Sequence, residues 1–314
     1  MQDLHSFMPR KRRIEFPGAV YHVLSRGNYR KELFLEEGSG ERFEETLMEA
    51  VDRCGWRVFS YVIMSNHFHL ALETPEPNLV TGMKWLQGTF ATRFNRFRKE
   101  SGHVFQGRYK AILVGEGRPL LGLIDYIHLN PVRAGICGVD WLKGYRLSSY
   151  PKFWKQRVRK GLDRAAMLSL IGAADSVGGM RKYLEHLNLS EAQDPGHKEK
   201  LQREYCRGWF IGPKAERKEL AKELAEWNPV IDWELADYAE LTEERWERIV
   251  REELNRRGKD EKDLAGEAKG ARWKAEIALR LRLETTAGNP WIASRLQMGH
   301  PSRASNLLRD VRNV

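Results

Sequence analysis

The stretch that decides the fold is Tyr61-Val62-Ile63-Met64-Ser65-Asn66-His67-Phe68-His69-Leu70-Ala71-Leu72. An apolar run, a polar turn-like interruption at Ser65-Asn66 and then alternating residue types predict a buried β-strand. Residues two apart in a strand point to the same side, so His67 and His69 share one face and Phe68 turns to the other. Two imidazoles so placed can hold a divalent metal ion. A lone His-x-His pair, however, is more often a hydrogen-bonded and inert feature of a sheet face.

Composition indicates a soluble globular protein. The chain has 314 residues, of which 31% are charged and 41% hydrophobic. It has no apolar run as long as a membrane span, and the segment from Met1 to Arg13 has no apolar signal core. The three cysteines stand far apart, which fits reduced thiols better than a disulfide framework or a zinc finger. We therefore expect a cytoplasmic protein, associated with the nucleoid and without a membrane partner.

The charge balance points to a polyanionic partner, most simply nucleic acid. Lys and Arg number 53 against 43 Asp and Glu, a formal net charge of +10. The excess is concentrated, with eleven bases and four acids in residues 77–150, and eight and three in residues 271–314. The basic run Arg10–Arg13 is either a flexible tail or a phosphate contact.

The order of elements predicts an α+β sandwich with helices on one face of a sheet. Residues 16–28 indicate a turn, a strand and a second turn. Apolar spacing predicts helices over residues 41–54, 77–99 and 118–130, the second with a basic side that includes Arg93 and Arg96.

Residues 102–110 interleave aromatic and basic side chains. This pattern suits nucleic acid, because cations meet phosphates and rings stack on bases. Aromatic residues in the core and bases at a solvated rim would explain the phenylalanines, but explain Arg108-Tyr109-Lys110 less well.

Tyr126 and Asn130 are four residues apart on the third predicted helix, so they are neighbours on one face. Two imidazoles and one neutral side-chain oxygen suit a hard divalent ion that grips a phosphate. A tyrosine hydroxyl nearby could attack that phosphate and form a covalent phosphotyrosine. Tyr109 is the rival nucleophile, because Arg108 and Lys110 beside it could lower its pKa.

Four ordered motifs, Tyr21–Asn28, Met64–Leu70, Gly107–Lys110 and Asp125–Gly135, resemble those of the single-tyrosine HUH transposases. The closest branch is the REP-associated tyrosine transposases. The resemblance covers about the first 150 residues. Ser65 stands where relatives often have Pro.

The resemblance implies a ferredoxin-like HUH nuclease domain, with an antiparallel sheet and helices on one face. It implies a Mg²⁺- or Mn²⁺-dependent enzyme, monomeric or homodimeric, that cuts and rejoins single-stranded DNA beside an imperfect palindromic (REP-like) hairpin. Tyr126 would be the nucleophile, linked to the 5′-phosphate and leaving a free 3′-OH. His67 and His69 would be metal ligands, with Asn130 third, where the wider group often has Gln. The residues that we expect to contact DNA in this part of the chain are Arg10, Lys11, Arg12, Arg13, Arg26, Arg93, Arg96, Arg108, Tyr109, Lys110 and Arg133.

The C-terminal pattern predicts a helix-turn-helix. A helix to about residue 286 is followed by a short helix from Asn289, a turn over residues 297–300 and a last helix from Pro301. It resembles the C-terminal DNA-binding domain of replication-initiator proteins; a small helical cap is the alternative. The side chains that would face a DNA groove are Ser302, Arg303, Ser305 and Asn306.

We therefore predict three parts: a nuclease domain over residues 1–150, a helical middle region over 151–240 and a DNA-binding domain over 241–314. The alternative from another class is a non-catalytic, sequence-specific DNA-binding regulator that uses the same basic surfaces. A phosphodiesterase acting on RNA is weaker, since nothing in the sequence resembles a paired-histidine general acid–base site.

Overall fold

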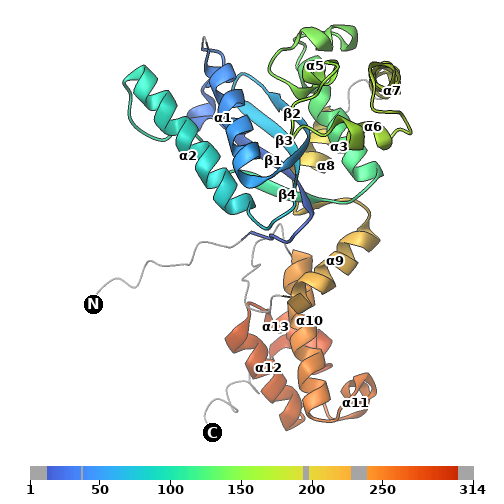
Figure 1. Ribbon diagram of the computed structural model, residues 1–314. Helices are drawn as coiled ribbons and strands as arrows, with labels where there is room; N and C mark the ends of the chain where they lie inside the picture. Colours follow the sequence, from blue (N-terminus) through green and yellow to red (C-terminus); the bar gives the residue numbers. More distant parts are fainter. Residues whose placement is uncertain (1–12, 37, 194–197, 228–238, 303–314) are drawn as a thin grey trace. The chain divides into compact units, whose positions relative to one another are not determined.

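The computed structural model describes residues 13–36, 38–193, 198–227 and 239–302 (Figure 1). Contacts between Cα atoms divide the chain into two compact units. One unit is Arg13–Pro213, and the other contains the described residues from Lys214 onward. No helix within these ranges combines the length and the apolar character needed to cross a membrane.

The first unit is built on a five-stranded sheet in the order β2-β3-β1-β4-β5. The strands are β1 Ala19–Arg26, β2 Arg57–Ile63, β3 His67–Thr74, β4 Lys110–Val114 and β5 Phe210–Ile211. The first four pair antiparallel, and β5 adds a short parallel pairing to β4. With the connecting helices, the chain order β-α-β-β-α-β and this strand order give the ferredoxin-like arrangement. The sheet is mixed because β5 comes from residues far along the chain.

The stretch over residues 61–72 forms a hairpin, where the sequence pattern predicted a single strand. The Met64 amide donates a hydrogen bond to the His67 carbonyl oxygen (2.8 Å), which closes a turn around Ser65 and Asn66. Both β2 and β3 are buried, so the apolar pattern continues through both strands and hides the turn between them. The predicted facing is confirmed, because Phe68 packs on one side of the sheet and His69 on the other.

Helices cover both faces of the sheet, not only one. On the Phe68 side lie α1 (Ser39–Cys54) and α2 (Leu79–Arg98), whose Phe43 and Phe90 rings pack at 5.1 Å. The Phe43 ring is 4.6 Å from the Phe68 ring. On the histidine side, α3 (Arg118–His128) packs against β2 and β3. The apolar stripe of α3 buries the part of this face that would otherwise meet water.

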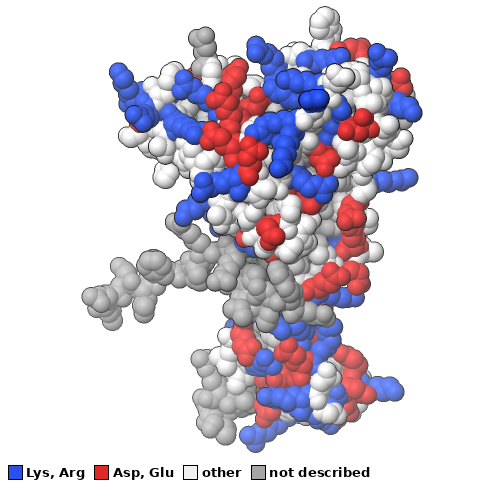
Figure 2. Space-filling model, in the orientation of Figure 1, with Lys and Arg blue, Asp and Glu red and all other residues white. Residues whose placement is uncertain are grey.

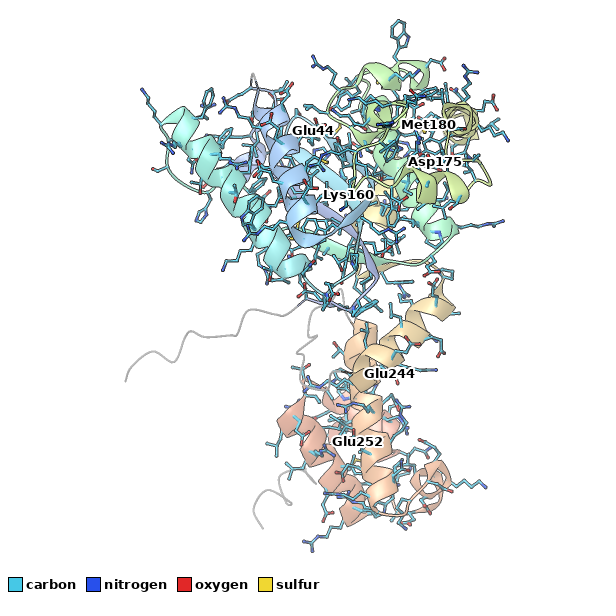
Figure 3. The ribbon with its side chains drawn as sticks, in the orientation of Figure 1. Glu44, Lys160, Asp175, Met180, Glu244 and Glu252 are labelled. Atoms are coloured by element: carbon cyan, nitrogen blue, oxygen red, sulfur yellow. The ribbon has the colours of Figure 1, made fainter. Side chains whose placement is uncertain are left out.

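The residues after about 150 pack with the sheet. The remaining elements of this unit are η1 Asn28–Arg30, α4 Asn130–Arg133, η2 Val139–Gly144, α5 Ser149–Phe153, α6 Arg164–Ser169, α7 Val177–Gln193 and α8 Lys198–Cys206. Glu44, labelled in Figure 3, joins three elements: its carboxylate accepts from the Tyr61 hydroxyl (2.7 Å) and from Lys152 Nζ (2.9 Å). Residues 151–213, which the sequence assigned to a separate middle region, therefore belong to the same compact unit as the sheet.

The second unit is helical in the residues described. Its helices are α9 Lys214–Trp227, α10 Ala239–Arg256, α11 Glu261–Gly266, α12 Arg272–Glu284 and α13 Asn289–Arg295. Ile249, Ile277 and Ile292 belong to one buried cluster. Positive φ angles at Gln297 (51°) and Gly299 (86°) form the predicted turn after α13. Arg303, Ser305 and Asn306 lie outside the described residues, so the helix-turn-helix stays a prediction.

Candidate active site

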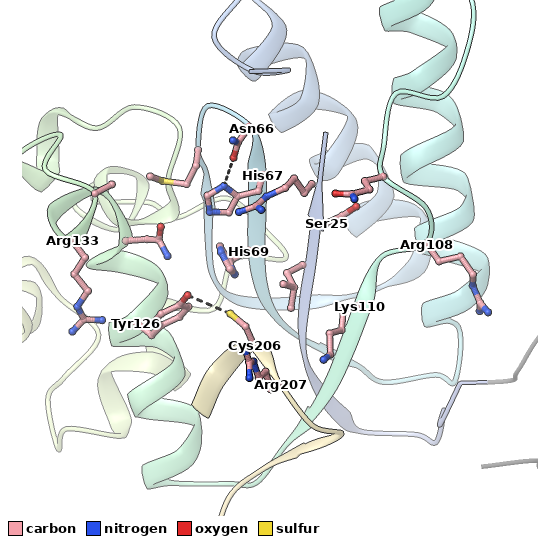
Figure 4. Close-up of a pocket in the computed structure, with 16 residues that line it drawn as sticks. Ser25, Asn66, His67, His69, Arg108, Lys110, Tyr126, Arg133, Cys206 and Arg207 are labelled. Atoms are coloured by element: carbon pink, nitrogen blue, oxygen red, sulfur yellow. Dashed lines mark hydrogen bonds between the residues drawn. The ribbon is translucent and has the colours of Figure 1, made fainter. Parts of the chain in front are cut away.

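One pocket collects the residues predicted to carry the chemistry. Its volume is about 660 Å³, and His67, His69, Tyr126 and Asn130 line it (Figure 4). The two histidines come from β3, Tyr126 comes from α3, and Asn130 begins α4. Helix α3 brings Tyr126 to the sheet because its apolar stripe packs on β2 and β3.

The two histidine rings stand perpendicular to one another, with centroids 5.0 Å apart. His67 Nδ1 lies 2.7 Å from Asn66 Oδ1, and because an amide oxygen only accepts, this nitrogen carries the proton. His69 Nδ1 lies 2.8 Å from His22 Nε2. Burial holds the pKa of His69 well below its usual value, and the neighbouring His22, His67 and Arg26 add to the shift. The His69 ring is therefore neutral near pH 7.

Tyr126 lies beside these rings and is buried. Its ring centroid is 5.5 Å from that of His69, and its hydroxyl is 3.3 Å from Cys206 Sγ. Burial raises the pKa of Tyr126, and Cys206 raises it further. A hydrogen bond from the Asn130 side chain and the charge of Arg133 act in the opposite direction. The phenol is therefore protonated at rest, with two neighbours that favour its anion.

The pocket lining is basic. It holds five cationic side chains and, among its described residues, no carboxylate. The five are Arg26, Arg108, Lys110, Arg133 and Arg207. By contrast, acidic and basic side chains are interspersed over the face seen in Figure 2. Arg133 is ion-paired with Glu191 (3.2 Å), which is not among the lining residues. A lining with an excess of positive charge favours an anion such as a phosphodiester.

Two sets of side chains could hold a metal ion here. His67, His69 and Asn130 offer two imidazoles and an amide oxygen, as the sequence predicted. His22, His69 and Cys206 offer ligand atoms within 4.8 Å of one another. Both ring nitrogens of His22 already have partners, the Tyr205 carbonyl oxygen and His69 Nδ1. Coordination through His22 would therefore break one of these two hydrogen bonds.

Tyr109, the rival nucleophile, is not among the lining residues. Its side chain is 6% exposed, and its hydroxyl finds no hydrogen-bond partner within the described part of the chain. The Arg13 guanidinium lies 3.7 Å from the ring centroid. Burial raises the pKa of Tyr109 to about 12 and outweighs the lowering by Arg13 and Arg108. Arg108 therefore acts on this pKa in the expected direction, but the net shift is upward because burial is the larger effect.

Other predicted DNA contacts lie away from the pocket. Arg93 on α2 makes a two-pronged ion pair with Glu49 of α1 (2.8 and 2.9 Å), so it belongs to the helical layer behind the sheet. Arg96 is exposed on the same helix. Ser302 is exposed, and its hydroxyl lies 2.7 Å from His300 Nδ1. Arg10, Lys11 and Arg12 lie outside the described residues.

Sequence reasoning missed His22, Asn66, Cys206 and Arg207. His22 lies behind His69 on the neighbouring strand β1. Asn66 could have been found, because a polar residue beside a histidine in a turn is a plausible ring partner. Cys206 ends α8 and Arg207 follows it, far along the chain, and no local pattern links them to residues 61–72.

Comparison with known proteins relates part of the chain to transposases. Residues 16–130 match the family model described as "Transposase IS200 like". Two solved structures are similar: a REP-associated tyrosine transposase bound to a REP hairpin, and a putative transposase from Deinococcus radiodurans R1. The first is 15% identical, with a TM-score of 0.39 and coverage of 46% of this chain and 85% of its own. The second is 20% identical, with a TM-score of 0.28 and coverage of 41% and 92%. No curated protein gives a significant match.

The matched segment holds four of the residues that line the pocket: His67, His69, Tyr126 and Asn130. Residues 16–130, about a third of the chain, are thus similar to IS200-like transposases. This agrees with the resemblance to REP-associated tyrosine transposases that the sequence motifs carry.

Proposed function

We propose that this protein is a transposase: a metal-dependent single-strand DNA endonuclease and strand-transferase that uses Tyr126 as its nucleophile and acts beside imperfect palindromic hairpins. The observation that carries the proposal is the meeting of Tyr126 with His67 and His69 in one basic pocket (Figure 4). The hairpin substrate is proposed from the motif resemblance.

The chemistry is phosphoryl transfer in two steps. The Tyr126 oxygen attacks a backbone phosphorus, the bond from phosphorus to the 3′-oxygen breaks, and the phenol proton passes to solvent. This leaves a 5′-phosphotyrosine and a free 3′-OH. A 3′-OH then attacks the phosphotyrosine, which restores a phosphodiester and releases the phenol. The basic side chains hold the scissile and flanking phosphates while this happens.

His67, His69 and Asn130 would hold a divalent ion, Mg²⁺ or Mn²⁺. Bound there, such an ion would polarise the phosphate and stabilise the charge that develops on it. The proton positions support this set. His67 Nδ1–H points to Asn66 Oδ1, which leaves the ring's lone pair on Nε2. The side-chain oxygen of Asn130 can bind the ion while its side-chain NH₂ group donates a hydrogen bond to the Tyr126 oxygen.

The test is a covalent adduct. The full-length protein is incubated with a labelled single strand that carries a hairpin and a 3′ or 5′ flank, with Mg²⁺ or Mn²⁺ or with a chelator. We expect a denaturation-resistant protein–DNA adduct only with metal, and none with Tyr126→Phe. Tyr109→Phe is the matched control and should form the adduct as the unmodified protein does. An adduct that survives Tyr126→Phe and disappears with Tyr109→Phe would refute the assignment.

The same assay addresses the rival functions. A regulator that only binds DNA predicts no adduct with any metal, and binding that a chelator leaves unchanged. An RNA phosphodiesterase predicts cleavage of an RNA strand in preference to a DNA strand of equal sequence. We further propose that residues 241–314 form a DNA-binding domain separate from the compact unit of residues 13–213, and that Ser302, Arg303, Ser305 and Asn306 contact DNA.

A further inference from the structure

His22 is a buried histidine that the proposed chemistry does not use. It lies on β1, is 0% exposed, and stacks on His69 with ring centroids 5.1 Å apart. Its Nε2 lies 2.8 Å from His69 Nδ1, and its Nδ1 lies 2.7 Å from the Tyr205 carbonyl oxygen. A chain of hydrogen bonds therefore runs from the end of α8 through β1 to β3.

The proton positions along this series of hydrogen bonds follow from its first acceptor, the Tyr205 carbonyl oxygen. A carbonyl oxygen only accepts, so His22 Nδ1 must carry a proton and donate it to Tyr205. A neutral His22 ring then has its lone pair on Nε2, which accepts from His69 Nδ1–H. The His69 lone pair is consequently on Nε2. Complete burial of His22 favours the neutral ring.

We propose that His22 is a positioning residue that, anchored by the Tyr205 carbonyl oxygen, holds His69 in the tautomer whose Nε2 lone pair faces the pocket. The inference rests on the proposed function for its consequence, a divalent ion held at that nitrogen. Asn66 does the same for His67, since its amide oxygen accepts from His67 Nδ1–H. Both histidines of the pair are thus set to the same tautomer by hydrogen-bond partners, His22 for His69 and Asn66 for His67.

The anchor comes from outside the segment that matches the transposase family. Tyr205 lies in α8, and the family match ends at residue 130. The neighbouring Cys206 contacts the Tyr126 hydroxyl, and the Tyr205 ring stacks on the Tyr126 ring with centroids 5.0 Å apart. The last turn of α8 therefore supports both the ligand pair and the nucleophile.

The first test reads the tautomer directly in the full-length, metal-free protein. Histidine-selective ¹⁵N labelling and long-range ¹⁵N–¹H correlation spectra distinguish protonated from unprotonated ring nitrogens. We expect Nδ1–H and unprotonated Nε2 for both His22 and His69. A protonated Nε2 on His69 would overturn the proposal, since it would mean that His69 Nδ1 accepts from His22. This readout is independent of DNA cleavage, so failure to trap the Tyr126 adduct would refute the proposed function alone.

The second test separates hydrogen bonding from packing. His22→Gln keeps one donor and one acceptor in the side chain, and His22→Phe fills the space with neither. We expect His22→Phe to weaken Mn²⁺ binding, measured by the electron paramagnetic resonance signal of free Mn²⁺, by about 10- to 100-fold. His22→Gln should retain most of the affinity and keep the His69 tautomer.

The matched control is His128→Phe, which alters another histidine with 0% exposure, bonded to Tyr183 and Ser149. It should lower thermal stability and leave Mn²⁺ affinity and the His69 tautomer unchanged. Equal losses of Mn²⁺ affinity in His22→Gln and His22→Phe, or the same loss in His128→Phe, would overturn the proposal. If His22→Phe does not fold, the spectra of the unmodified protein and of His22→Gln still decide it.

Discussion

The five cations of the pocket predict how DNA binding responds to salt. Replacing Arg108 and Lys110 by Gln removes two of them, both adjoining β4. Each phosphate contact with a single strand contributes a slope of about −0.7 in a plot of log affinity against log salt concentration, because bound counterions are released. The double variant should therefore have a slope shallower by about 1.4. Between about 50 and 200 mM salt, the affinity advantage of the unmodified protein should shrink by about sevenfold.

The matched control is the double variant Arg93→Gln and Arg96→Gln. It changes the net charge by the same amount, but both residues belong to α2, behind the sheet. Breaking the exposed pair of Arg93 with Glu49 costs about 0–1 kcal/mol, which leaves the fold intact. Fluorescence anisotropy of a labelled single strand, titrated at several salt concentrations, gives both slopes. Equal slope changes in the two double variants would refute the argument, since the pocket would then have no special share of the phosphate contacts.

Three further predictions concern stability. Burial lowers the pKa of His22 to about 4 and that of His128 to about 3, below the value of about 6.5 that an unfolded chain shows. The unfolded chain therefore binds more protons below that value, and stability present above pH ~6.5 is lost as pH falls, by up to about 1.4 kcal/mol per pH unit for each histidine. In urea unfolding at several pH values, His128→Phe should reduce the dependence of the free energy of unfolding on pH by the contribution of one histidine. An unchanged pH dependence would show that the buried His128 does not cause it. Tyr109→Phe removes a buried hydroxyl without a partner in the described residues, so the free energy of unfolding should stay equal or rise by up to about 1 kcal/mol in the same assay. A fragment of residues 13–213 should fold alone by circular dichroism and elute as a compact species; one ending at residue 150 should not, because it loses packing partners of the sheet and α3.

Much of the site followed from short-range periodicity. The two-residue repeat of a strand gave the common face of His67 and His69, and the helical repeat gave the shared face of Tyr126 and Asn130. The structure brings all four to one pocket. Tyr109 precedes β4 and does not line the pocket, although Arg108 and Lys110 on either side of it do; Arg13 covers its ring.

Arg93 and Arg96 show where composition misleads. A basic helix side was read as a nucleic-acid surface, but α2 pairs one of these cations with an acid of α1. The pairing of Arg93 with Glu49 could not be predicted from the sequence, because it depends on how α1 and α2 pack. A charged helix side is therefore better evidence for solvent exposure than for a phosphate contact.

What periodicity could not supply was the set of contacts behind the pocket. The position of His22 depends on the antiparallel register of β1 with β3, in which Leu24 faces His69 and His22 lies diagonally across. The register is set by the whole sheet and not by any residue near His22. Tyr205 and Cys206 reach Tyr126 and His22 only after α8 has packed on α3. Because these supports come from a segment beyond the family match, the last turn of α8 could be altered to tune the tautomer of His69 and the acidity of Tyr126 while β3 and α3 keep the reacting groups themselves unchanged.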